Sequence, residues 1–149
     1  MTTKNSSIDT ESGEVSYIDE CTIGNDMDEL TDNINRLMFL CHGVAVESGW
    51  WDDIRTDSPI IRNDGEMLCL MHSELSEAME GLRKDLMDTH LPERKMAEVE
   101  LADCVIRIMD FAGAKNYDLG GAVIEKIRYN TKRADHKPEN RAKEGGKKF

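Results

Sequence analysis

The run MAEVELADCVIRIMDFAGA, residues 96–114, constrains the fold more than any other part of the sequence. A helix built from it is apolar on most sides, and the exceptions are its charged residues Glu98, Glu100, Asp103, Arg107 and Asp110. A helix with so wide an apolar surface needs other helices to cover it. The run is therefore predicted to be the central helix of a helical domain.

Three further segments repeat apolar residues at steps of three or four, which is the spacing of one helix face. The first spans residues 26–49 and is followed by a long structured loop. The second begins after Asn63 or Asp64, either of which is a good N-cap, and ends near Asp85. The last follows the turn at 116–118. Because 149 residues fit one domain, we expect a single all-α domain with four main helices.

Charge divides the chain into parts. The formal net charge is -11, yet residues 126–149 contain nine Lys or Arg against three Asp or Glu. Residues 1–24 are rich in Ser, Thr, Asp and Glu and lack an apolar period, so they are predicted to be a flexible acidic extension. Residues 25–137 are predicted to form the folded domain, and residues 138–149 a basic tail.

The same composition excludes several classes of protein. A strongly acidic body argues against nucleic-acid binding, because neutralising phosphates needs a basic surface. No apolar run approaches the length that spans a bilayer, so no membrane association is expected. The four cysteines, which are Cys21, Cys41, Cys69 and Cys104, form no C-x-x-C pair, and no signal peptide precedes them. We therefore expect reduced thiols and a cytoplasmic location.

Two carboxylate pairs are the strongest chemical signal. Residues three apart on a helix project within about 60° of each other, so Glu74 and Glu77 share one face, as do Glu100 and Asp103. A short connector joins the two helices, which makes them antiparallel neighbours. Four carboxylates near the core edge would repel one another unless a hard cation such as Mg²⁺ bound them. The alternative is that each pair lies on an ordinary solvated helix face.

A second group of residues could bind an anion. Lys126, Asn130 and Arg133 are four and three residues apart and so line one helix face, where they could hold a triphosphate against the metal. The alternative is a basic final turn favoured by the helix dipole. Trp50 and Trp51 follow the first helix, and an indole there could stack on a nucleobase, although at least one of them is expected in the core.

Three stretches together resemble a known family. They are ELSEA at 74–78, EVELADCVIRIMDFA at 98–112 and EKIRYNTKRADHK at 125–137, in the family's order. On these motifs, over roughly residues 26–137, the chain resembles the all-α nucleoside triphosphate pyrophosphohydrolases, and among them the MazG-like proteins of phages. E-x-x-E followed by E-x-x-D is moderately specific, and Lys126, Asn130 and Arg133 strengthen the match.

The resemblance implies a function and an assembly. In the family, the four acids, here Glu74, Glu77, Glu100 and Asp103, bind Mg²⁺ or Mn²⁺. The enzyme cleaves a nucleoside or deoxynucleoside triphosphate between the α and β phosphates, which releases a monophosphate and pyrophosphate. The resemblance also implies a four-helix bundle completed by homo-oligomerisation, as a dimer or tetramer. A phage-encoded protein of this kind would act in the host cytoplasm.

Two other functions remain open at this point. One is hydrolysis of another pyrophosphate-bearing nucleotide, such as an alarmone, which only the base-side pocket would distinguish. The other is a non-catalytic acidic helical protein that binds a host partner. The acidic quartet together with the Lys-Asn-Arg group argues against the second, because a pure interaction protein does not need those groups at those spacings.

Overall fold

The computed structural model describes residues 22–53, 55–56 and 58–146 of the chain. Its elements are α1 (Thr22–Glu47), β1 (Asp52–Asp53), β2 (Ser58–Pro59), α2 (Asp64–Lys84), α3 (Met96–Ala114), α4 (Leu119–Lys132), the 3₁₀ turn η1 (Ala134–His136) and α5 (Pro138–Arg141). The chain is mostly helical, which confirms the all-α prediction. Within the predicted loop after α1, the two short strands pair in antiparallel orientation.

The two predicted terminal segments extend beyond the described residues. Residues 1–21 of the predicted acidic extension, 1–24, lie outside the described residues. Helix α1 begins at Thr22, which is earlier than the predicted start at residue 26. The basic tail, residues 138–149, contains the short helix α5 and lies outside the described residues from 147 onward.

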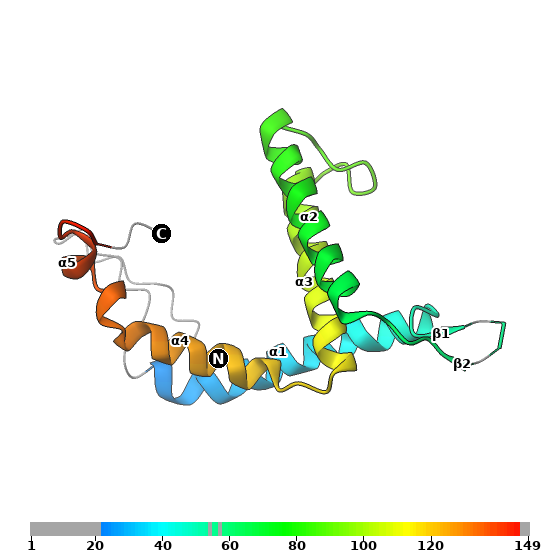
Figure 1. Ribbon diagram of the computed structural model, residues 1–149, viewed down its shortest axis with the longest axis horizontal. Helices are drawn as coiled ribbons and strands as arrows, with labels where there is room; N and C mark the ends of the chain where they lie inside the picture. Colours follow the sequence, from blue (N-terminus) through cyan, green and yellow to red (C-terminus); the bar gives the residue numbers. More distant parts are fainter. Residues whose placement is uncertain (1–21, 54, 57, 147–149) are drawn as a thin grey trace, which may run out of the picture.

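The helices form two arms that diverge from a common base (Figure 1). One arm is the antiparallel pair α2 and α3, and the other is α4 lying along the N-terminal half of α1. Most of the packing between helices joins α2 to α3, α1 to α3 and α1 to α4. The helix predicted to be central, α3, therefore does contact two neighbours, but much of its apolar surface remains uncovered within one chain.

Local capping explains where the helices begin. The Asn63 side chain accepts a hydrogen bond from the Glu66 amide at 3.1 Å, which sets the start of α2 as predicted. The Asp118 side chain accepts from the Gly121 amide at 3.0 Å and so caps α4. Asn35 of α1 holds this cap in place, because its amide donates to Asp118 at 2.8 Å.

Gly120 lets α4 approach α1. The Asn35 side-chain oxygen accepts a hydrogen bond from the Gly120 amide at 2.8 Å, and a Cβ at Gly120 would overlap the Thr31 carbonyl oxygen. Gly120→Ala is therefore expected to lower the Tm by roughly 3–10 °C in a thermal melt, because the helices must separate. Gly43→Ala is the matched control, since a Cβ there meets nothing within 4 Å. Equal melting temperatures for wild type and Gly120→Ala would contradict this account.

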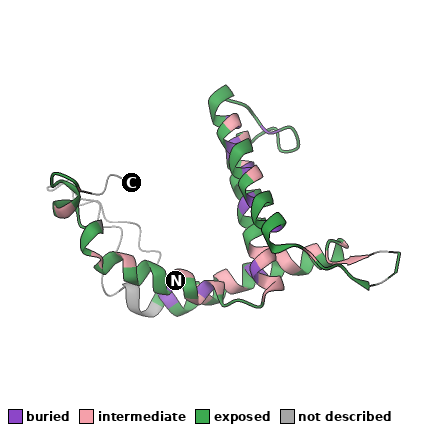
Figure 2. Ribbon diagram, viewed as in Figure 1, coloured by how far each residue is buried: buried purple, intermediate pink, exposed green. Residues whose placement is uncertain are grey.

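Few apolar residues are buried in the described chain. The buried ones are Met27, Met38, Met67, Met71, Ala78, Ala97, Cys104, Ala112 and Ile124, and the exposed large apolar side chains outnumber them. Along the ribbon, buried stretches are short and exposed ones predominate (Figure 2). The exposed set includes Leu37, Phe39, Leu40 and Val44 on α1, Leu75, Met79 and Leu82 on α2, and Leu101, Val105 and Ile108 on α3.

None of the described helices is long and apolar enough to cross a membrane.

Candidate metal centre and adjoining cavity

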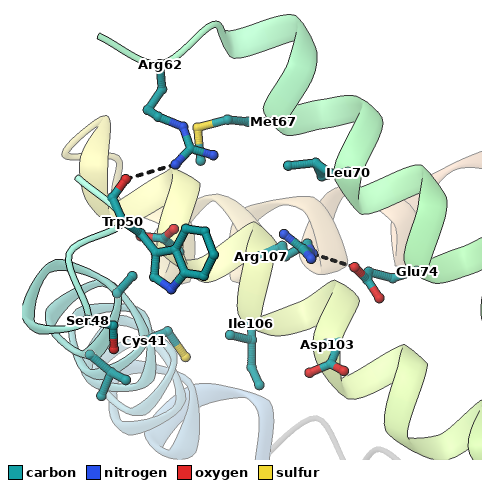
Figure 3. A pocket seen from close by; sticks show the side chains of 13 residues that line it. Cys41, Ser48, Trp50, Arg62, Met67, Leu70, Glu74, Asp103, Ile106 and Arg107 are labelled. Atoms are coloured by element: carbon teal, nitrogen blue, oxygen red, sulfur yellow. Dashed lines mark hydrogen bonds and ion pairs between the residues drawn. The ribbon is translucent and has the colours of Figure 1, made fainter. Parts of the chain in front are cut away.

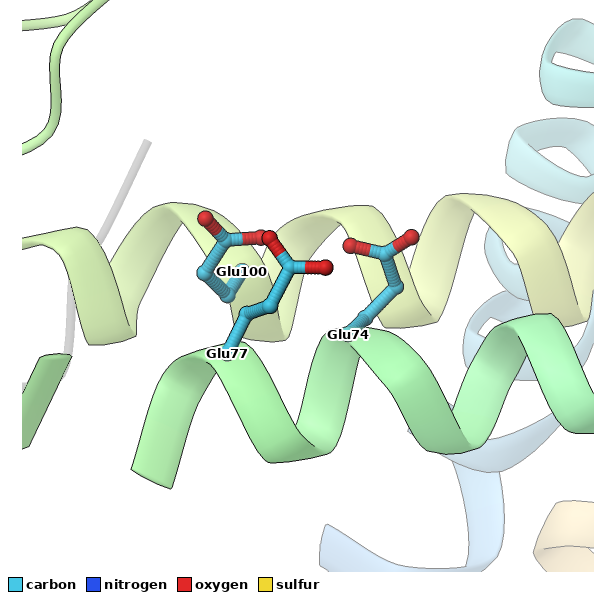
Figure 4. A group of neighbouring side chains, drawn as sticks. All are labelled: Glu74, Glu77 and Glu100. Carbon is cyan, nitrogen blue, oxygen red and sulfur yellow. The ribbon is translucent and has the colours of Figure 1, made fainter. Parts of the chain in front are cut away.

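Three of the predicted acids meet between α2 and α3 (Figure 4). Glu74, Glu77 and Glu100 each offer a carboxylate oxygen, and these oxygens all lie within 4.8 Å of one another. Glu74 and Glu100 are 6 and 8% exposed, whereas Glu77 is exposed. The prediction that the two helices bring their carboxylates together is confirmed for these three residues, which we call the carboxylate cluster.

A close approach of the two helices fixes their alignment. A Cβ at Gly81 would lie 3.0 Å from the Ala97 amide nitrogen, so glycine lets α2 and α3 come together there. Beyond that point the Leu86 amide donates to the Gly81 carbonyl, and the Met96 amide donates to the Leu86 carbonyl, both at 3.0 Å. This turn sets the register in which Glu74 and Glu77 face Glu100.

The cluster is electrostatically strained without a cation. Burial raises the pKa of Glu100, and the charges of Glu77 and Glu74 and a hydrogen bond with Glu74 raise it further. Burial also raises the pKa of Asp103, with the Glu74 charge as the next cause. Asp103 lies outside the group of three and lines the adjoining cavity instead.

The donor set fits a hard divalent cation. Carboxylate oxygens from two rigid helices are the ligands that Mg²⁺ and Mn²⁺ prefer. Bringing like charges together in a buried place is unfavourable unless a cation compensates them. The carboxylate cluster could therefore hold a metal ion, as the sequence predicts.

A cavity of about 560 Å³ opens beside the cluster (Figure 3). It lies between the C-terminal end of α1, the beginning of α2 and the middle of α3. Glu74, Asp103 and Arg107 line one side, Trp50 and Arg62 line another, and the apolar lining includes Val44, Met67, Leu70 and Ile106. Volumes of 300–1,000 Å³ are typical of small-molecule sites, so the cavity has room for a nucleoside.

The two tryptophans have different surroundings. Trp50 is 63% exposed and lines the cavity. Trp51 is half-buried, and its indole nitrogen donates a hydrogen bond to the Asp110 carboxylate at 2.8 Å. Its ring packs edge-on against the His42 ring, with the two ring centroids 5.3 Å apart. His42 also contacts Asp110 through Nδ1 at 2.8 Å. Trp51 is therefore part of a structural network, and Trp50 is the indole available to a ligand.

The predicted anion-binding residues lie on the other arm. Lys126 and Arg133 flank the Tyr129 ring, with their cationic groups 4.8 and 5.7 Å from its centroid. Arg133 follows the last residue of α4 and pairs with Asp135 at 2.6 Å. Asn130 has a buried side-chain oxygen with no hydrogen-bond partner in the described part of the chain. Within one copy of the chain, α4, which carries Lys126 and Asn130 and ends before Arg133, lies on a different arm from the α2–α3 pair that carries the carboxylate cluster (Figure 1).

Arg107 is the site residue that sequence reasoning missed. Its Nε lies 2.5 Å from Glu74 Oε1, which makes it a direct counter-ion of the cluster. The signal was present in the spacing, because Arg107 follows Asp103 by four residues and so shares its helix face.

No protein-family model, no curated protein and no solved structure matches this chain.

The raised carboxyl pKa values predict a pH-dependent stability. In the metal-free protein, Glu100 and Asp103 hold protons at pH values where the unfolded chain has released them. Stability must then fall as the pH rises above the ordinary carboxyl range, and a divalent cation should restore it. We expect the Tm with EDTA to fall as the pH rises above the ordinary carboxyl range, until Glu100 and Asp103 have released their protons, and the increase in Tm with Mg²⁺ to grow over the same range.

Glu100→Gln is the control for this measurement, since it should flatten the metal-free profile. The carboxyls whose pKa is lowered act only below the ordinary value of 3.8 and do not interfere; these are Asp53, Asp85, Asp88 and Asp118. A metal-free Tm that rises with pH across this window would contradict the assignment.

Proposed function

We propose that the chain is a Mg²⁺-dependent nucleoside triphosphate pyrophosphohydrolase of the MazG-like type, with Mn²⁺ as a possible substitute ion. The observation that carries this proposal is the carboxylate cluster opening onto a cavity large enough for a nucleoside. The motif resemblance at 74–78, 98–112 and 125–137 supports the same reaction class.

In this proposal Glu74, Glu77 and Glu100 would hold the cation, and Asp103 lines the cavity beside them. A bound ion would supply Lewis-acid stabilisation of the phosphate charge. Water attacks the α phosphorus, the bond to the oxygen bridging the α and β phosphates breaks, and pyrophosphate leaves. Asp103 accepts the water's proton, a role that suits a carboxylate of raised pKa beside the cavity.

The nucleoside occupies the cavity. Its apolar lining suits a base and sugar, and the exposed Trp50 indole offers a face on which a base can stack. Arg62 donates to the Trp50 carbonyl at 2.8 Å and lies over the Trp51 ring at 5.9 Å, which holds this wall of the cavity in place.

A second copy of the chain completes the bundle in this proposal. Large apolar side chains are exposed along α1, α2 and α3, and a second copy would cover them. The basic end of α4 is complementary in charge to the carboxylates of the α2–α3 arm of another copy. A symmetric dimer makes this contact twice, once for each copy. A homodimer, or a homotetramer built from such dimers, is the expected assembly.

The test is pyrophosphate release from each of the eight common ribonucleoside and deoxyribonucleoside triphosphates, with Mg²⁺ and with EDTA. The expected result is metal-dependent release, with the base preference read from the relative kcat/KM values. Release from none of them would overturn the proposal. Hydrolysis of an alarmone in the same assay would then indicate another pyrophosphate-bearing substrate, and inactivity on all of them would favour a binding protein.

A further inference from the structure

Arg107 links the carboxylate cluster to the cavity. It extends from α3, and its Nε lies 2.5 Å from Glu74 Oε1 on α2 (Figure 3). The two side chains differ in exposure, because Arg107 is 43% exposed whereas Glu74 is buried. The ion pair is thus a buried carboxylate neutralised by a guanidinium that reaches it from the open side.

The guanidinium has unused hydrogen-bonding capacity. Arginine offers five N–H donors, and in the described part of the chain only the Nε donor of Arg107 has an acceptor, which is Glu74. Arg107 lines the cavity together with Asp103, so its remaining N–H donors lie at the cavity. They are therefore available to an anionic group placed there.

A divalent cation and Arg107 compete for the same carboxylate. Both carry positive charge; Arg107 contacts Glu74 Oε1, and a cation held by the cluster would also bind the Glu74 carboxylate. When a cation is held by the carboxylate cluster, the guanidinium loses part of its attraction to Glu74 and is repelled by the new charge. The ligand that suits a displaced guanidinium is phosphate, which accepts its hydrogen bonds in a fork and also approaches the cation.

We propose that Arg107 exchanges partners during substrate binding. It neutralises Glu74 in the metal-free protein, and it contacts the phosphates of the nucleotide once a divalent cation is bound to the cluster. This proposal rests on the proposed function, because it takes the anion to be the triphosphate. Lys126 and Arg133 of the same chain lie on the other arm, whereas Arg107 of the α2–α3 arm lines the cavity and contacts the cluster.

The exchange predicts opposite effects of one substitution. Arg107→Gln removes the competitor for Glu74, so Mn²⁺ alone, followed by electron paramagnetic resonance without nucleotide, should bind about two- to fivefold more tightly. The same variant loses the phosphate contact, so the KM for the preferred triphosphate should rise about 10- to 100-fold. A residue that only supports the fold would weaken both.

Two further variants sharpen the test. Arg107→Lys keeps a positive charge beside Glu74 but lacks the paired N–H donors that bind phosphate in a bidentate way. It should therefore bind Mn²⁺ like the wild type, while its KM should be raised as in Arg107→Gln. Arg83→Gln is the matched control, because Arg83 pairs with Glu80 at 3.1 Å outside the cluster, and neither value should change in it. Circular dichroism verifies that each variant is folded.

The outcomes separate this inference from the proposed function. Weaker Mn²⁺ binding by Arg107→Gln, or an unchanged KM in an active protein, would overturn the exchange of partners. An inactive wild type would overturn the proposed function and the phosphate contact with it, while the Mn²⁺ measurement would still show whether Arg107 competes with the cation.

Discussion

Glu77→Gln is expected to abolish metal-dependent pyrophosphate release, with kcat/KM lowered by roughly 10²–10³-fold or more. Glu77 is the exposed member of the carboxylate cluster and is not needed to fill the core. The substitution removes one negative charge facing the cation and leaves the volume of the side chain almost unchanged. The measurement is the pyrophosphate-release assay at saturating Mg²⁺.

The fold of this variant should persist, which makes the loss of activity interpretable. The Glu77 charge is one cause of the raised pKa of Glu100, so removing it relieves repulsion, and the metal-free Tm should be equal to that of the wild type or higher. The matched control is Glu80→Gln on the same helix. Glu80 pairs with Arg83 and Lys84 outside the cluster, so its loss should leave kcat/KM within about twofold. If Glu77→Gln released pyrophosphate at the wild-type rate, the carboxylate cluster would take no part in the reaction.

The helices and the cluster could be predicted from the sequence because both depend on local periodicity. Apolar steps of three and four identified α2, and the apolar run at 96–114 identified α3. Of the two N-cap candidates for α2, Asn63 and Asp64, Asn63 is the one that caps it. A connector too short for anything but an antiparallel return then placed Glu74 and Glu77 opposite Glu100. Asp103 shares the helix face of Glu100, but it lies one turn farther along α3 and lines the cavity.

The arrangement of the two arms could not be predicted in this way, since it depends on contacts between residues far apart in the chain. Asn35 meets Asp118 and Gly120 only because α4 lies along α1. The different surroundings of Trp50 and Trp51 likewise depend on Asp110, far along the chain. Helix periodicity carries no information about such pairs, so the separation of the Lys126 face from the carboxylates appears only in three dimensions.

That separation leads to the second large prediction. Asp103 lies roughly 16 Å along α3 from its C-terminal end at Ala114. On the other arm, Lys126 lies about 10 Å along α4 from its first residue, Leu119. A lysine side chain cannot span such a gap. If Lys126, Asn130 and Arg133 contact the triphosphate, the copy that supplies them is not the copy that supplies the cluster. Each site would then draw on two chains.

Two inactive variants should therefore restore activity when they share a dimer. Glu77→Gln and Lys126→Met are each expected to be inactive or nearly so. In a mixed dimer, however, one site combines the intact cluster of one copy with the intact α4 of the other. Random pairing makes about half of the dimers mixed with one working site each, so co-expressed chains should recover roughly a quarter of wild-type activity.

The control for complementation pairs two variants of the same arm. Glu77→Gln with Glu100→Gln must stay inactive, because both sites of any mixed dimer lack one carboxylate of the cluster. Recovery in the first pair and not in the second would show that the carboxylate cluster and the α4 residues of one site come from different chains. Subunit exchange or contamination by wild-type protein would raise the activity of both pairs alike. If the first pair stays as inactive as its parents while Lys126→Met alone is inactive, α4 acts within its own chain, and the arms must close on one another when substrate binds.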